Sequence, residues 1–458
     1  MSKTMTAWTS SARPRQVCAE GRLVSESGKI LKLAVPTVLG LVSTVAMGAI
    51  DTAMLAPFGS DVVAAVGLST SAFIFVNSAV IGFVSVIGVG ISRAHGSGDL
   101  RDTSEAMSSG LALAVILSFL AALLMSLASS LVPSLAPDPK IASLTGTYWL
   151  TLTLAALPHT MLAAFRGAYS ALGRPWTALA VTLLGIGFNV PLNHLLIHGG
   201  AGMGGLGILG AGLASFLAKT LAVMVFVFHW RAARSMRPTR HGLRLSFGSV
   251  MARARDGAPV AIGSVAEGGA YAVTGFMAAM LGATALAAHQ VVHSVGVLFY
   301  MVPIGMMIAS SIRAGQLIGA GRKSEVICIL KAANLITLAW STGVLLFVLA
   351  LRMPVANVLS PERDVASLAA TLLLTMAFVQ FADCVQSNAL GVLRGMVDNV
   401  LPSVVTVIAY WFLALPLAAF LGLVLNLGVV GVTLGYGLVV LGVAAFLQIR
   451  AGKRSKLF

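Results

Sequence analysis

Charged residues and cysteines are scarce in this sequence. Only 10% of its 458 residues are charged, whereas an average soluble domain has ~25%. So few charges cannot cover the surface of a water-soluble protein of this length, which excludes that class. The three cysteines, Cys18, Cys328 and Cys384, are widely separated, with neither a pairing pattern nor metal-ligand spacing. We therefore expect no disulfide and no structural zinc site.

Sequence signatures of catalysis and of nucleotide use are also missing. We find no nucleophile–base pair and no phosphate-binding loop, so neither an enzyme nor an ATP-driven pump is indicated, and no cofactor is expected. The stretch Gly205–Gly210 fits the dinucleotide pattern G-x-G-x-x-G. It follows no predicted strand, however, and its glycines are typical of close helix packing.

Long hydrophobic runs dominate the chain instead. Hydrophobic residues make up 58% of it, and runs of ~20 residues, long enough to cross ~30 Å of hydrocarbon, recur throughout. Most runs lack the polar face of a helix at the surface of a soluble protein. We therefore predict an all-α polytopic membrane protein with twelve transmembrane helices. The predicted spans are 31–56, 62–91, 107–133, 143–165, 176–198, 205–229, 257–281, 285–311, 328–350, 366–391, 401–424 and 428–448.

Basic residues distinguish the two sides of the membrane. Nearly all Lys and Arg fall in the N-terminal tail, in every second loop and in the C-terminal tail, whereas the opposite loops contain only Lys140, Arg352 and Arg363. By the positive-inside rule both termini are cytoplasmic, which requires an even number of spans. Residues 1–27 have no apolar core, so we expect a cytoplasmic tail rather than a cleavable signal peptide. The short loops fit a bacterial inner membrane.

The chain contains an internal duplication. Three short motifs recur at one constant offset, and others recur with small shifts. The matched motifs are Val35-Pro36 with Ala258-Pro259, Ala64-Ala65 with Ala287-Ala288, Gly96-Ser97-Gly98 with Gly319-Ala320-Gly321, Arg166-Gly167 with Arg394-Gly395, Pro191 with Pro416, and Gly207–Gly210 with Gly428–Gly431. Two six-helix bundles of the same orientation, related by a pseudo-two-fold axis along the membrane normal, are expected from such a repeat. The predicted divisions are a tail at 1–27, lobes at 28–230 and 257–449, a basic cytoplasmic linker at 231–256 and a tail at 450–458.

Three acidic residues, Asp51, Glu267 and Asp383, lie deep inside hydrophobic segments. A carboxylate in lipid costs ~2.5–3.5 kcal/mol on insertion scales, so such residues usually face a water-filled pathway. At ~1.5 Å of rise per residue, Glu267 lies ~18 Å and Asp383 ~16 Å from the nearest cytoplasmic arginine of its own helix. The two therefore share a level near the midplane. Asp51 lies ~28 Å from the cytoplasmic side, near the outer end of the first lobe.

Other polar side chains follow helical spacing around these acids. The expected supporting residues are Gln380, Gln386 and Ser387 near Asp383, Tyr271 and Thr274 near Glu267, Gln290 on the next span, and Asn189 and Asn193 in the fifth. Interhelical hydrogen bonding explains buried Ser, Thr and Asn, but it explains a matched Glu and Asp much less well. Two carboxylates in a confined cavity could bind Na⁺ through oxygens or carry a proton, and the residues leave both ions open.

At these residues the sequence resembles the multidrug and toxic compound extrusion (MATE) transporters, closest to the NorM-type branch, from about residue 28 to 450. The resemblance depends on the order and spacing of several stretches, namely Gly48–Met54, Asn189-x-Pro191-Leu192-Asn193, Glu267, Ala287–Gln290 and Asp383-x-x-Gln386 through Gly395. It implies a V-shaped pair of bundles that exports cationic amphipathic compounds in exchange for Na⁺ or H⁺. It also implies a cation site at Glu267 and Asp383 and a polar first-lobe site at Asp51, Asn189 and Asn193.

Two other functions were considered. A lipid-linked precursor flippase of the same superfamily would prefer basic residues in its cavity, whereas the cavity candidates here are acidic. A non-transporting membrane module gives no reason for a duplicated six-span unit with matched acids. We expect a monomer in the lipid bilayer that acts on a small cationic molecule. No nucleic-acid partner is expected despite the net charge of +15, because the basic residues follow the membrane topology.

Overall fold

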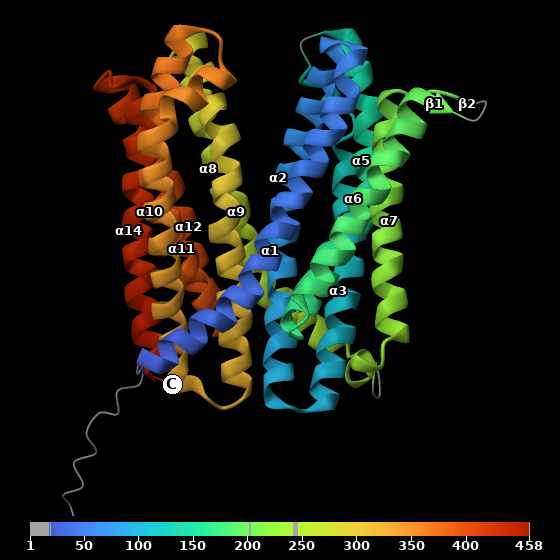
Figure 1. The fold of residues 1–458 in the computed structure, drawn as a ribbon, viewed down its shortest axis with the longest axis vertical. Coiled ribbons are helices and arrows are strands. Elements are labelled where there is room, and N and C mark those ends of the chain that lie inside the picture. The colour runs from blue at the N-terminus through green and yellow to red at the C-terminus, as the bar shows by residue number, and fades with distance from the viewer. Residues whose placement is uncertain (1–17, 19, 137, 201–202, 241–245, 458) are drawn as a thin grey trace, which may run out of the picture.

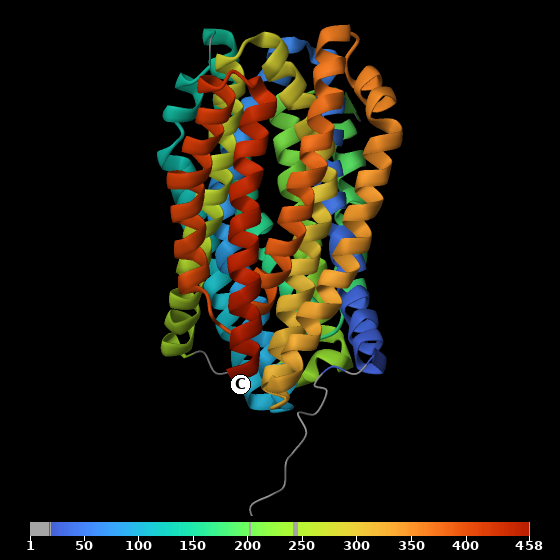
Figure 2. The same ribbon diagram turned by 90° about the vertical axis from the view of Figure 1, so that its left-hand side faces the viewer.

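Long helices form nearly all of the structure, a computed structural model that describes every residue except 1–17, 19, 137, 201–202, 241–245 and 458. They run roughly side by side in two bundles (Figure 1), and the second bundle faces the viewer in Figure 2. The first bundle contains α1 (Glu20–Leu55), α2 (Ser60–Ser97), α3 (Leu100–Leu127), α5 (Pro139–Ala171), α6 (Pro175–His198) and α7 (Ile208–Ala232). The second contains α8 (Phe247–Met280), α9 (Ala283–Gly319), α10 (Val326–Leu359), α11 (Arg363–Gly395), α12 (Val400–Ala409) with α13 (Leu415–Ala419), and α14 (Gly428–Leu457).

Short elements connect these helices or continue them. They are η1 (Ala56–Phe58), α4 (Leu131–Ser134), η2 (Arg234–Arg240), η3 (Lys323–Glu325), the π-helical turns η4 (Tyr410–Ala414) and η5 (Phe420–Val424), and the paired strands β1 (Gly199–Gly200) and β2 (Met203–Gly204). The π-helical turns flank α13, which contains Pro416. Because proline has no N–H to donate, the regular hydrogen-bond ladder is disturbed at this point. The turn η4 brings Tyr410 into the bundle interior, where it is fully buried.

Eleven helical segments in the described part of the chain are long and apolar enough to cross a membrane. Helix α8 is not among them, because Glu267 and several glycines lower its hydropathy. It nevertheless has 34 residues and runs alongside the others (Figure 1). The all-α polytopic architecture predicted from the sequence is therefore confirmed, with α8 as the twelfth long segment. This helix already begins at Phe247, inside the stretch predicted as linker.

Each bundle has its own apolar core. The beginning of α1, however, packs in the core of the second bundle, and the beginning of α8 packs in the core of the first. One core extends from Leu55 to Val250, and the other from Ala270 to Ala451. Ile30, Leu33 and Ala34, near the start of α1, belong to the second core, whereas Val250, near the start of α8, belongs to the first. In Figure 1, α1 crosses from the second bundle to the first. A duplicated unit that kept the same contact in both copies would produce this reciprocal exchange.

The bundles meet at the end of the molecule where α1 begins and α14 finishes, and their ribbons diverge toward the other end (Figure 1). At the meeting point α2 and α9 approach so closely that glycine is required. A Cβ on Gly319 would lie 2.0 Å from the carbonyl oxygen of Arg93, and a Cβ on Gly96 would lie 2.2 Å from that of Gln316. Real Cβ atoms do not make contacts this short. The structure is thus V-shaped and closed at the end where α1 begins and α14 finishes.

A buried ion pair joins α1 to α9 at the closed end. The carboxylate of Glu26, whose exposed fraction is 1%, accepts hydrogen bonds from Arg313 at 2.6 and 2.9 Å and from Lys29 at 2.8 Å. Removing one partner of a buried pair leaves the other charge uncompensated. We expect Glu26→Gln to lower the melting temperature of the detergent-purified protein by about 2–4 °C in a thermal unfolding experiment.

Two further variants control this measurement. The double variant with Arg313→Gln should recover most of the loss, because neither buried charge remains. Asp61→Asn should leave the melting temperature unchanged, because Asp61 pairs with Lys140 at an exposed site, and exposed pairs contribute little. A single variant as stable as the parent protein would contradict a stabilising role for this pair.

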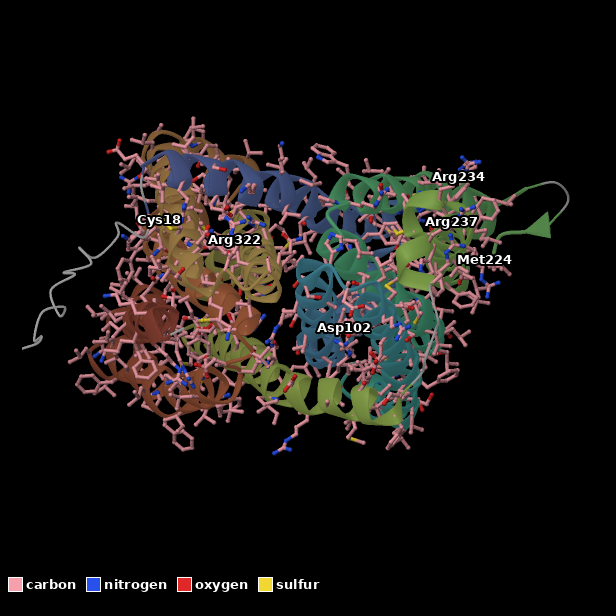
Figure 3. All side chains as sticks on the ribbon, turned by 90° about the horizontal axis from the view of Figure 1, so that it is seen from below. Cys18, Asp102, Met224, Arg234, Arg237 and Arg322 are labelled. Carbon is pink, nitrogen blue, oxygen red and sulfur yellow. A yellow bond between two sulfur atoms is a disulfide. The ribbon has the colours of Figure 1, made fainter. Side chains whose placement is uncertain are left out.

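Cys18 and Cys328 form a disulfide in the structure, so the expectation of unpaired cysteines was wrong. Their Cα atoms lie 5.6 Å apart although 310 residues separate them along the chain. Sequence spacing could not show this, because the pairing arises where α1 packs against α10. Cys384 is free and buried. Viewed from the closed end, Cys18 and Arg322 lie over the second bundle, and Asp102 lies over the first (Figure 3).

Candidate functional site

Asp51 lies in a hydrogen-bonded cluster inside the first bundle. Asn193 of α6 and Ser215 of α7 donate to its two carboxylate oxygens at 2.5 and 2.6 Å, and Asn193 also donates to Asn189 at 3.2 Å. Asp51 is 6% exposed, and both asparagines are fully buried. The structure therefore brings together the three predicted first-lobe residues. It adds Ser215, which the sequence did not single out because serine is common in membrane helices.

A small cavity lies beside this cluster, toward the closed end. Met47, one helical turn before Asp51, lines it, as do the side chains of Arg166, Lys219 and His159. Hydropathy placed Arg166 in a loop, but α5 continues to Ala171, so this arginine lies within the helix. The expectation that the cavity candidates are all acidic was therefore incomplete, because the first bundle also presents basic side chains to a cavity.

Glu267 and Asp383 occupy the second bundle on α8 and α11. Glu267 accepts a hydrogen bond from the hydroxyl of Tyr300 at 2.9 Å. Within the described residues, Asp383 has no hydrogen bond and no ion pair. Both side chains are partly buried, and the two carboxylates are near enough for charge repulsion. Neutralising one of the two carboxylates, by a bound cation or by a proton, would relieve this repulsion, which agrees with the chemistry expected from their matched depth.

Tyrosine gathers around these two acids. The sequence has six tyrosines, and Tyr271, Tyr300, Tyr410 and Tyr436 all lie in this region. The ring centroids of Tyr410 and Tyr436 are 5.6 Å apart, and those of Tyr271 and Tyr436 are 6.3 Å apart. Only Tyr271 was predicted as a site residue, because the other three are isolated residues on separate helices. Their one distinguishing feature in the sequence is that tyrosine is rare in this chain. Aromatic faces beside carboxylates suit an organic cation.

The predicted supporting residues of the second bundle divide into two groups. Gln386 hydrogen-bonds the hydroxyl of Tyr410 at 2.7 Å, and Tyr271 stacks on His293 at 5.5 Å, so both belong to the aromatic region. The remaining predicted residues lie elsewhere: Gln380 donates to the carbonyl of Phe299 at 3.1 Å, Thr274 donates to the carbonyl of Tyr271 at 2.7 Å, Ser387 is buried, and Gln290 is exposed. These contacts join helices or close a helical turn.

A second small cavity adjoins Glu267. Arg394, Asp398 and Asn399 line it, and the buried side-chain oxygen of Asn399 has no hydrogen-bond partner in the described structure. No group of three or more His, Cys, Asp or Glu side chains within the described residues could hold a metal ion. A Na⁺ ion at Glu267 and Asp383 would therefore need hydroxyl, amide or water oxygens as additional ligands.

Two six-helix bundles are joined at one end; the first holds the carboxylate of Asp51 in its interior, and the second holds those of Glu267 and Asp383. This arrangement defines a polytopic helical membrane protein of the two-lobed transporter type. The MatE family model matches residues 36–195 and again residues 259–420, together more than half of the chain. The chain therefore belongs to the MatE family.

Relatives agree with this assignment. A probable multidrug resistance protein NorM from Deinococcus radiodurans is 32% identical over 354 residues, which cover 75% of this chain and 77% of the relative. Another from Bradyrhizobium diazoefficiens is 29% identical over 367 residues, 79% of each chain. Among solved structures, an outward-facing multidrug resistance MATE family transporter of the MOP superfamily shares the fold with a TM-score of 0.84. It is 18% identical, and the match covers 96% of this chain and 98% of that one.

Proposed function

We propose that the protein exports cationic amphipathic compounds from a bacterial cell in exchange for Na⁺ or H⁺, by alternating access. In this proposal it is a monomer in the inner membrane, and both termini are cytoplasmic. The carboxylates of Glu267 and Asp383, near each other and surrounded by tyrosines, are the observation that carries the proposal. The multidrug resistance names of the relatives support the substrate class.

The mechanism follows from the competition between two kinds of cation for these carboxylates. In the V-shaped state, a coupling ion entering from the open end neutralises the pair, so a bound organic cation loses its charge attraction and leaves. A one-for-one exchange of monovalent cations moves no net charge, so the concentration gradient of the coupling ion drives export; each tenfold of that gradient supplies ~1.4 kcal/mol, enough for about tenfold accumulation. The glycine contacts between α2 and α9 would separate in the opposite state, which would open the cytoplasmic end.

A lipid-linked precursor flippase is the second candidate. Arg166 and Lys219 favour it, since they place positive charge beside a cavity where an anionic headgroup could bind. The acid pair of the second bundle has no role in that function. A non-transporting membrane module leaves both cavities without a purpose, so we place it below either transporter.

Ethidium efflux from proteoliposomes tests the proposal. With Na⁺ and pH gradients imposed separately, we expect the rate of ethidium export to increase with one of the two gradients. The effective gradient identifies the coupling ion. Liposomes without protein control for leakage. Export under neither gradient would overturn the antiporter proposal.

A further inference from the structure

The first bundle contains two cationic side chains that no described carboxylate pairs with. Arg166 donates to the hydroxyl of Thr44 at 2.9 Å, which is a neutral partner. Lys219 makes no hydrogen bond and no direct ion pair within the described residues. Asp51 attracts its ammonium from beyond contact distance, and the ammonium lies 5.8 Å from the centroid of the Phe73 ring. Both line the same cavity. Unpaired charges at membrane depth are costly and usually mark a ligand path or site.

The rest of this cavity also offers donors without carboxylates. His159 lines it, and the enclosed Nδ1 atom of this residue has no hydrogen-bond partner in the described structure. The hydroxyls of Thr44 and Thr182 also line it, but each already donates to the backbone carbonyl four residues earlier in its own helix, and the other lining residues are apolar or glycine. Arginine and lysine have donors and no acceptor. Such a lining fits an anion and provides no partner for a cation.

Comparison of the two repeats shows how the first bundle differs in charge from the second. At the constant offset of the repeat, Thr44 occupies the position of Glu267, and Arg166 matches Arg394 in the paired Arg-Gly motifs. In the second bundle, Arg394 and Glu267 line one cavity and attract each other. In the first bundle, threonine occupies the position of that glutamate, so Arg166 has no carboxylate partner among the residues that the structure describes. Equivalent places in the two lobes thus carry different charge.

Lys219 adds a second positive charge to the first bundle. The glycine motifs that open α7 and α14 align it with Val440, which is apolar and fully buried. Lys219 lies one helical turn beyond Ser215, the residue that donates to Asp51. One turn corresponds to ~6 Å along the helix. A negative and a positive side chain therefore lie about one turn apart in the same bundle.

We propose that the cavity formed by Arg166, Lys219 and His159 binds the carboxylate of zwitterionic amphipathic substrates, while the cationic end of the same molecule is attracted to Asp51. This inference rests on the proposed export function and specifies part of its substrate range. Arginine binds a carboxylate with two parallel hydrogen bonds, and lysine adds a point charge.

A matched pair of dyes tests the proposal. Tetramethylrhodamine with a free benzoate carboxylate is a zwitterion, and its methyl ester carries the same xanthylium cation without the carboxylate. Binding of each to the full-length protein in detergent is measured by fluorescence anisotropy. We expect Lys219→Met and Arg166→Gln each to weaken binding of the zwitterion by about 10-fold or more and that of the ester by less than about 2-fold.

Two controls and four contrary results make the test decisive. Lys219→Arg should retain binding of the zwitterion, and Lys140→Met, at an exposed site, should change neither dye. Equal loss of both dyes in the cavity variants would show a structural role and overturn the proposal, as would unchanged binding of both. If inorganic phosphate displaced both dyes equally, the cavity would be a binding site for a free anion, and the proposal would be overturned. If ethidium export persists while the parent protein does not distinguish the dyes, the proposed function stands and this inference fails.

Discussion

Replacing Asp383 by Asn is expected to abolish export driven by an ion gradient. Asparagine has nearly the same shape but cannot carry the negative charge that a coupling ion or a cationic substrate would neutralise. Loss of coupling removes the accumulation that the ion gradient supports, which is about tenfold for a tenfold gradient in a one-for-one exchange. The measurement is ethidium efflux from energised vesicles, with the amount of protein in the membrane determined on the same samples.

The same helix provides a matched control for this variant. Asp364→Asn alters an exposed acid in the first turn of α11 and should leave efflux unchanged. Glu267→Gln should behave like Asp383→Asn, because the two carboxylates belong to one site. Full-rate export by Asp383→Asn would show that this residue has a structural role only, and the coupling would then have to involve Asp51.

The fold was predictable because its strongest determinant is local. Apolar runs of membrane-spanning length specify helices whatever their neighbours, and the alternation of basic loops requires an even number of spans. The ends of the helices were less predictable. Hydropathy ends a span at the first charged residue, yet α5 continues past Arg166 to Ala171, and the guanidinium donates to the hydroxyl of Thr44 on α1. Such a contact with another helix cannot be predicted from the hydropathy of one segment.

The site was predictable only where spacing along one helix determines it. Depth counting placed Glu267 and Asp383 at one level, and one-turn spacing placed Asn189 beside Asn193. The partners from other helices, Ser215 and Tyr300, depend on which helices pack together, and no pattern within a single segment reports that. The Cys18–Cys328 pair was missed for the same reason.

Gly319→Ala is expected to reduce efflux by about 10-fold while the protein remains folded in the membrane. Alanine favours a helix over glycine by up to ~1 kcal/mol, so local helix stability would improve. At this position, however, the new Cβ would lie 2.0 Å from the carbonyl oxygen of Arg93 and 3.0 Å from the backbone nitrogen of Ser97. Backbone atoms cannot rotate away, and overpacking of this kind typically costs ~1–3 kcal/mol. The closed end would separate, and the V-shaped state would lose population.

Gly343→Ala is the matched control, since this glycine also lies within a long helix and a Cβ there would meet nothing within 4 Å. It should receive the same helical benefit and keep full efflux. Hydrogen exchange of the backbone around Arg93–Ser97 should accelerate in Gly319→Ala and remain unchanged in Gly343→Ala, because exchange reports local opening. Equal behaviour of the two variants would mean that the close approach of α2 and α9 does not hold the closed end. A difference confined to Gly319 would identify this contact as one that an alternating-access cycle must make and break.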